Sequence, residues 1–458
     1  MDGAVFWVYM KTLLKFKFFG KSILQKLVIT IQMYGENNLA NHASACAYGF
    51  LLSIAPMLLL IAFFIFIIFN PSPRAIIFLF GNLPFVGNLF DEHWLSSDFF
   101  SIGKLGISGL ISILSIFWAG RILAVSVQRA LTGIFPADKN RNPITNTLIT
   151  LVITAVVFIF VLLFIFSSGP AVRFYRYYLS LAERRILNII SIIIGSRFFN
   201  VVLLGLISFF IFLLVPANSP RKFSALQGVL LFTITYSCVV KLLSVILDTS
   251  RYNFIYGTLG NLIFLLVNVY FFFILFFIGA QFAYVNDYFD ALLFSKMRKV
   301  KLSADNFKRS KHLNLLVSLF NPLDSSLNKY LRQYKKDEII FVKGDSGDEI
   351  YYILEGYVEI LLSVDHDVCE TIYVSAGILN TDSFFGEIGY LLSEDRTATI
   401  KAGTDVSVLV LPSALFDIIL KYDNDLDRNI IENITRRLKD TTEQYVLLKT
   451  KEKDQLTQ

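Results

Sequence analysis

Six apolar stretches lie between residues 44 and 285, and each is long enough to cross a membrane as a helix. Spanning about 30 Å of hydrocarbon takes roughly 20 helical residues, because only a helix satisfies its own backbone groups there. Hydrophobic residues make up 55% of the chain, well above the share in soluble domains. The sequence therefore predicts an all-α bundle of six transmembrane helices. The predicted spans are residues 44–69, 105–127, 144–167, 198–215, 225–247 and 256–285.

Basic residues between the predicted spans indicate the orientation of the bundle. Lys and Arg concentrate before the first span, between the second and third spans, and after the sixth. Since cytoplasmic loops carry such residues in excess, we expect both termini in the cytoplasm. The arginine-rich loop at residues 173–185 does not fit this orientation, because it would lie on the side of the membrane away from the cytoplasm. Residues 1–40 form a cytoplasmic or interfacial segment, and residues 24–33 read as an amphipathic helix. We expect no removable signal peptide.

A few polar side chains within the predicted spans are candidates for function. Polar groups in hydrocarbon are costly unless they pair or meet water, so they often mark a transport pathway. They can equally link helices or extend to the membrane surface. No stretch interleaves basic and aromatic residues as a nucleic-acid groove would, so membrane lipids are the expected partners. The candidate residues are Arg121, Lys241, Asn268 and Gln281, together with Asn200.

Three of these stretches resemble the YihY/BrkB family of bacterial inner-membrane proteins. They are SACAYGFLLSIAPMLLL from residue 44, SCVVKLLSVIL with Lys241, and the run at residues 256–282. The resemblance covers about residues 21–290 and implies a multi-pass protein of the inner membrane. Gln281 is a departure, because members often carry Glu there, which puts a proton-relay role at this position in doubt.

The family formerly carried a ribonuclease label, which the histidines of this chain do not support. None of them has the paired His/Asp spacing that would hold a catalytic metal ion. We therefore expect no enzymatic activity and no metal. The four histidines are His42, His93, His312 and His366.

A basic linker at residues 291–312 separates the bundle from a second domain at residues 313–448. Short helices near residues 313–331 precede strand-like runs that alternate with Gly and Asp turns, namely EIIFVK, EIYYILEGYVEILLSV, ETIYVS, ATIKAGT and DVSVLVL. Many short strands at close spacing predict an antiparallel β-roll. Helices from about residues 413 and 425 follow. The chain is thus a multi-domain protein, a six-helix bundle followed by a cytoplasmic α+β roll.

The run FFGEIGYLLSEDRTATIKA at residues 384–402 resembles the phosphate-binding cassette of cyclic nucleotide-binding domains. Gly386 lets the backbone approach a ligand, and Arg396 can hold a cyclic phosphate through two charge-assisted hydrogen bonds. The resemblance implies that Glu387 accepts a ribose hydroxyl, and that the ligand is cAMP or cGMP. The implied binding residues are Phe385, Gly386, Glu387, Ile388, Gly389, Arg396, Thr397 and Ala398.

Two features leave the nucleotide site open to another interpretation. The Pro-Gly-Asp that usually precedes such a cassette is replaced by Asn-Thr-Asp-Ser at residues 380–383. The roll could also be intact around a degenerate pocket, with Glu387 and Arg396 forming a solvated pair. Thr397 leans toward cGMP by resemblance, but the choice between cAMP and cGMP also depends on the last helix.

Two functions remain open for the whole chain. One is a transporter or lipid exporter regulated by cyclic nucleotide, and the other is a non-transporting membrane scaffold that recruits partners. The sequence lacks a helix-turn-helix after the sensor, a carbonyl filter of a cation channel, and kinase or cyclase motifs. The last helix, residues 425–448, either caps the purine or pairs with a second subunit in a homo-oligomer.

Overall fold

The computed structural model consists of two units. One unit is Thr30–Asp287, and the other combines Met1–Ile29 with Tyr288–Gln458. The structure describes residues 3–53, 107–137, 142, 144–154, 197–246, 258–306, 316–366 and 370–423, followed by 425, 426, 428, 430–436 and 439. Most of the first and third predicted spans, the arginine-rich loop and the end of the predicted linker lie outside these residues.

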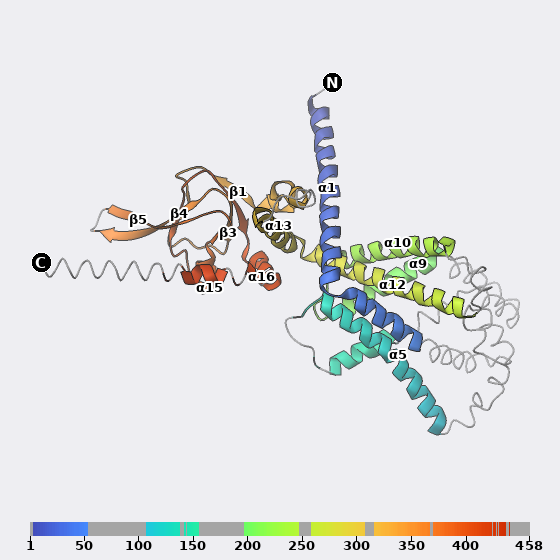
Figure 1. The fold of residues 1–458 in the computed structure, drawn as a ribbon. Helices are drawn as coiled ribbons and strands as arrows, with labels where there is room; N and C mark the ends of the chain where they lie inside the picture. Colours follow the sequence, from blue (N-terminus) through green and yellow to red (C-terminus); the bar gives the residue numbers. More distant parts are fainter. Residues whose placement is uncertain are drawn as a thin grey trace, which may run out of the picture. The chain divides into compact units, whose positions relative to one another are not determined.

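The Thr30–Asp287 unit is helical wherever it is described, apart from short connections (Figure 1). Three helices follow predicted spans to within three residues at each end, and α5 runs seven residues past the end predicted for the second span. Among the residues that the structure describes, two stretches are long and apolar enough to cross a membrane, Lys222–Leu243 and Leu265–Asp287. The labelled helices are α5 (Ile107–Ile134), α9 (Arg197–Leu214), α10 (Lys222–Ile246) and α12 (Thr258–Asp287), and residues 39–53 and 144–154 are also helical.

Helices α10 and α12 cross at a pair of glycines. A Cβ atom added to Gly228 would overlap the carbonyl oxygen of Gly279, and one added to Gly279 would lie 2.7 Å from that of Gly228. Backbones approach this closely only where both residues lack side chains. At the end of α12, the Asp287 carboxylate accepts hydrogen bonds from the backbone N–H of Arg221 (2.7 Å) and the hydroxyl of Ser224 (2.6 Å), and so caps α10.

Replacement of Gly228 by alanine should force the two helices apart. The added methyl group meets backbone, which cannot rotate away, so we expect thermal stability in detergent to fall clearly. Gly205→Ala on α9 is the matched control, because its Cβ would meet only side-chain methyl groups at 3.5 and 3.6 Å. This control should keep or slightly raise stability, as Gly→Ala does in helices by up to about 1 kcal/mol. Equal melting temperatures for both variants would contradict the close crossing.

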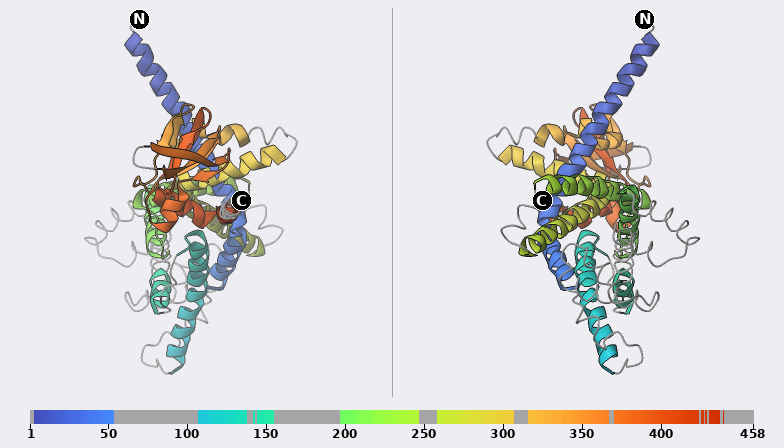
Figure 2. Two further views of the ribbon diagram at one scale, coloured as in Figure 1. Left: turned by 90° about the vertical axis from the view of Figure 1, so that its left-hand side faces the viewer. Right: turned by 90° about the vertical axis from the view of Figure 1, so that its right-hand side faces the viewer.

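The second unit contains the predicted β-roll, built from two antiparallel sheets of four strands. Figure 2 shows the strands of both sheets gathered in one body from two further sides. One sheet has the order β1-β8-β3-β6, with β1 (Leu331–Tyr334), β8 (Val406–Leu411), β3 (Ile350–Glu355) and β6 (Phe384–Phe385). The other has the order β2-β7-β4-β5, with β2 (Ile339–Phe341), β7 (Thr399–Ala402), β4 (Val358–His366) and β5 (Glu370–Leu379).

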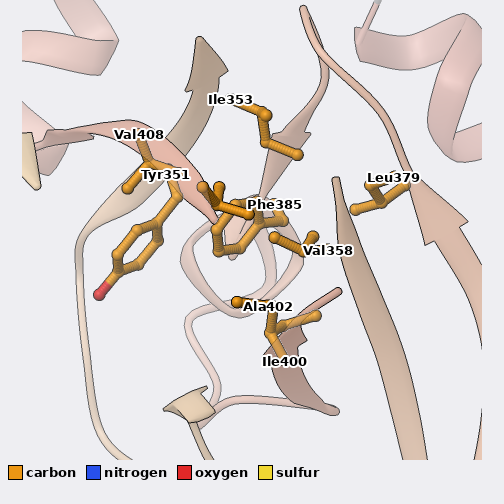
Figure 3. Packing of buried hydrophobic residues seen from close by; sticks show 9 residues of the cluster. Tyr351, Ile353, Val358, Leu379, Phe385, Ile400, Ala402 and Val408 are labelled. Atoms are coloured by element: carbon orange, nitrogen blue, oxygen red, sulfur yellow. The ribbon is translucent and has the colours of Figure 1, made fainter. Parts of the chain in front are cut away.

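Apolar side chains of both sheets meet in one core. β3, β6 and β8 contribute from the first sheet, and β4, β5 and β7 from the second. Their alternation along each strand is that of sheets packed face to face. Phe385, which directly precedes Gly386, lies among these side chains (Figure 3). The buried members are Tyr351, Ile353, Val358, Leu379, Phe385, Ile400, Ala402, Val406 and Val408.

Helices lie before, between and after the strands along the chain. The segment predicted as a basic linker differs from that expectation, because most of it is helix α13. The side chains of Leu293 and Phe294 in α13 are fully buried, which explains why a lysine-rich segment is ordered against the roll. The flanking elements are α1 (Gly3–Glu36), α13 (Phe289–Asn306), η3 (Pro322–Asp324), η4 (Ser326–Tyr330), α15 (Glu387–Leu392) and α16 (Ser413–Tyr422).

The N-terminal part of α1 belongs to the same unit as the roll. The Lys21 ammonium donates to the carbonyl oxygen of Ser318 at 2.9 Å, and the Gln25 amide donates to that of Leu319 at 2.7 Å. The ammonium of Lys26 lies 4.9 Å from the centre of the Phe289 ring. Residues 21–26, predicted as part of an interfacial segment, therefore contact the segments that lead into the roll.

Candidate nucleotide site

The predicted cassette occupies the connection from β6 to β7. Gly386 has φ +80°, a left-handed conformation that glycine adopts without strain, and α15 begins at the next residue. The chain then returns through a turn at Ser393 to Arg396, just before β7. Glu387 and Arg396 are both buried, with 2% and 4% of their surfaces exposed. The two residues do not form the solvated surface pair of the alternative interpretation.

The Arg396 guanidinium is fixed by two backbone carbonyl groups. Its Nη1 donates to the carbonyl oxygen of Gly386 and its Nη2 to that of Glu349, both at 2.9 Å. The Arg396 backbone is also held, because its N–H donates to Asp345 and its carbonyl accepts from Gly344. Residues far apart in the sequence therefore hold one side chain in one position.

An aromatic cluster lies beneath the guanidinium. The central carbon of Arg396 is 4.5 Å from the centre of the Phe341 ring and 5.6 Å from that of Tyr351. The rings of Tyr351 and Phe385 are stacked with centroids 4.8 Å apart. Burial raises the pKa of Tyr351 to about 12, so its hydroxyl keeps its proton and donates to the Glu349 carboxylate at 3.2 Å. The rings face a cation with their negative surfaces, which stabilises the charge.

Two glycines make room for the guanidinium. A Cβ atom on Gly386 would lie 2.7 Å from Arg396 Nη1, and one on Gly347 would lie 2.8 Å from Nη2. Gly386 was among the predicted binding residues, and Gly347 was not. The two glycines of the GDSGDE run, Gly344 and Gly347, were the available sequence signal for it.

The remaining predicted residues lie around the same connection. Phe385 and Gly389 are buried, Gly386, Ile388 and Ala398 are half-buried, and Thr397 is exposed. The unusual segment at residues 380–383 still forms a turn, since Asp382 takes the left-handed φ of +65° that Asp tolerates. Its N–H and the carbonyl of Ser383 pair with the backbone of Ile353, so the departure leaves the approach to the cassette intact.

The candidate polar residues of the helical unit differ in their burial. Gln281 is fully buried, and its side-chain oxygen accepts a hydrogen bond of 3.1 Å from Asn37. Arg121 and Lys241 are exposed, and Asn268 is half-buried. Among the described residues, no group of three or more His, Cys, Asp and Glu side chains could hold a metal ion.

The two opposed sheets, with a cassette after β6 and a buried arginine before β7, define a cyclic nucleotide-binding domain. The family model of that description matches residues 331–423. The model described as Virulence factor BrkB matches residues 30–299, more than half of the chain. The chain therefore belongs to the BrkB family of membrane proteins and carries a cyclic nucleotide-binding domain behind the family region.

Similar curated proteins include members of different classes. A cyclic nucleotide-gated potassium channel of Rhizobium etli is 29% identical over 138 residues, which cover 29% of this chain and 36% of the channel. The cAMP-activated global transcriptional regulator Vfr of Pseudomonas aeruginosa is 29% identical over 136 residues, which cover 29% of this chain and 58% of the regulator. The chain thus spans less than two thirds of the length of either relative.

Solved structures with some likeness include the cAMP-bound EAL enzyme Bd1971. It is 28% identical, with a TM-score of 0.19, and the match covers 26% of this chain and 30% of that one. The catabolite activator protein of Thermus thermophilus is 22% identical, with a TM-score of 0.23, over 27% of this chain and 57% of that one.

Removal of the Arg396 side chain should loosen the cassette locally. Arg396→Ala leaves the carbonyl groups of Gly386 and Glu349 without their charged donor, which costs about 1–3 kcal/mol for such buried groups. Amide exchange at residues 344–351 and 384–390 should accelerate on the order of tenfold or more. Arg332→Ala, on the exposed face of β1, is the control and should leave these segments unchanged. Unchanged exchange in Arg396→Ala would show that the guanidinium does not hold the cassette.

Proposed function

We propose that this chain is an inner-membrane protein whose cytoplasmic domain binds a cyclic nucleotide and thereby regulates a transporter or lipid exporter formed by its helices. The observation that carries the proposal is the buried guanidinium of Arg396. Within the part of the chain that the structure describes, its partners are carbonyl groups and aromatic rings, and no carboxylate forms an ion pair with it.

A buried cation without an opposite charge is costly, and an anionic ligand offsets that cost. A cyclic phosphate fits the planar guanidinium, which can donate two parallel hydrogen bonds to its oxygens. Donors remain for such a ligand, because Arg has five N–H groups and the two carbonyl groups use two of them. Glu387, buried in the first turn of α15, supplies the acceptor proposed for a ribose hydroxyl. We propose cAMP or cGMP as the ligand, with Phe385 to Gly389 and Arg396 to Ala398 around it.

The membrane half is proposed to be a six-helix bundle at residues 41–290 with both termini in the cytoplasm. The bounds of α5, α9, α10 and α12 support this reading, as do the basic residues flanking the predicted spans. The proposed partners are membrane lipids, the cyclic nucleotide and a second copy of the chain, and nucleic acid is not among them. We propose that the chain has no enzymatic activity.

A non-transporting scaffold is the second candidate, and two observations favour it. Gln281, for which both a pathway role and a link between helices were open, links two segments through Asn37. The close crossing of α10 and α12 leaves no room beside Gly228. In a scaffold of this kind, nucleotide binding would change the recruitment of a partner or the oligomeric state. The two candidates share the sensor and differ only in what it controls.

Binding of cyclic nucleotide by the full-length protein in nanodiscs is the direct test. Isothermal titration with cAMP and with cGMP should show saturable binding of at least one. Arg396→Glu should weaken it by on the order of a hundredfold or more, since two charge-assisted hydrogen bonds are worth about 3 kcal/mol. Arg332→Glu introduces the same charge change on an exposed face and should bind like the wild type. No binding of either nucleotide, or equal binding by Arg396→Glu, would refute the sensor.

Flux measurements separate the two candidate functions. Liposomes containing the protein should show ion leakage or lipid scrambling that changes when cAMP or cGMP is added. Arg396→Glu should keep the basal rate and lose the response, since the substitution lies in the sensor. A nucleotide-insensitive rate in liposomes whose protein binds the nucleotide would favour the scaffold.

A further inference from the structure

Helix α13 is hydrogen-bonded to Asp423, the residue that directly follows α16. This contact lies outside the candidate nucleotide site. We infer that Asp423 and Ser295 form a clasp through which nucleotide binding at the cassette is passed to α13. The inference rests on the proposed function, because it concerns the regulation exerted by the same site.

The clasp is built around a fully buried carboxylate. The Ser295 hydroxyl of α13 donates to Asp423 Oδ2 at 2.7 Å, and the Lys299 ammonium lies 3.6 Å from Oδ1. Asp423 directly follows α16, and its oxygens also accept from the backbone N–H of Leu426. The carboxylate therefore joins three segments, namely α13, the end of α16 and the start of the helical residues that follow.

Two chains of contacts connect the cassette with α13. Through α16, the ring of Tyr390 in α15 packs against Phe416 with centroids 5.9 Å apart, and its hydroxyl bonds Asp417. The far end of α16 carries Tyr422, whose ring lies 5.6 Å from that of Tyr288, and then Asp423. A displacement of α15 on ligand binding would thus act on the first half of α16, and the helix would carry it to Asp423.

The second chain of contacts is shorter. Phe384 is two residues before Gly386, and its ring packs against Phe416 at 5.8 Å and against Phe294 of α13 at 6.1 Å. Phe294 also contacts Tyr352 of β3 at 5.0 Å. Further along α13, the Lys301 ammonium donates to the Asp382 carboxylate at 2.9 Å, in the turn that leads into the cassette. α13 therefore contacts the cassette and the turn before it, and it also contacts Asp423 after the end of α16.

The order of the helices along the chain makes α13 the element that would pass a change at the cassette to α12. Only Tyr288 separates it from α12, and Asp287, the last residue of α12, caps α10. A shift of packed helices is a common means of passing a local change through a protein, provided that the interface has two discrete arrangements. A buried carboxylate with a small set of donors meets that condition, since partial separation would leave its charge unpaired.

Reciprocity gives a sharp test. If nucleotide binding changes the clasp, loss of the clasp must change nucleotide affinity by the same factor. We would measure amide exchange at residues 289–303 in full-length protein in nanodiscs, with and without cAMP or cGMP, and nucleotide affinity in parallel. The variants are Asp423→Asn and, from the other side, Ser295→Ala, which leaves the Leu426 contact in place. Asp425→Asn is the matched control, because Asp425 is exposed and lies 3.9 Å from the same lysine.

The direction in which the nucleotide changes amide exchange in α13 fixes the direction in which the variants change nucleotide affinity. If the nucleotide lowers protection of α13 in the wild type, both clasp variants should bind it about fivefold or more tightly, and if it raises protection they should bind more weakly by a similar factor. Asp425→Asn should match the wild type. Unchanged exchange on nucleotide binding, wild-type affinity in Ser295→Ala, or the opposite pairing of signs would overturn the clasp and leave the sensor standing. A wild type that binds neither nucleotide would instead overturn the sensor, and the clasp with it.

Discussion

The buried guanidinium of Arg396 is the constraint around which the roll is arranged. A charge that is 4% exposed has to be held by groups that cannot move away, and here these are carbonyl groups of Gly386 and Glu349 above an aromatic floor. Gly347 and Gly386 lack side chains where the guanidinium lies, and the turn at Asp345 holds its backbone. Two stretches of the chain, residues 341–351 and 385–386, thus converge on one cation, whose charge we propose is matched by a ligand.

The same elements give the sensor a connection to the rest of the chain. Phe385 packs into the core beneath the arginine, whereas its neighbour Phe384 points to the other side and meets Phe294 of α13. Alternation along a two-residue strand therefore links the cassette to the helix that follows the last predicted span. α13 is covered by the roll on its apolar side and clasped by Asp423, so it belongs to the sensor although the family model extends into it.

Sequence patterns predicted the parts of the fold that depend on local periodicity. Five strand-like runs correspond to β2, β3 with β4, β5, β7 and β8, and five predicted spans begin within three residues of observed helices. β6 was missed because two residues show no period, and β1 because its first residue was assigned to a preceding helix. α13 was taken for a linker, since four basic residues hide an apolar face that only the roll explains. Arg396 and Glu387 were found through their motif, whereas Gly347 and Asp423 act through contacts distant in sequence.

A structure of the full-length protein determined with cAMP or cGMP would show whether Arg396 binds the cyclic phosphate. We expect two phosphate oxygens within about 2.7–2.9 Å of the Arg396 guanidinium, the distance of charge-assisted hydrogen bonds. A nucleotide bound elsewhere, or a phosphate that leaves the guanidinium to its carbonyl groups alone, would contradict it.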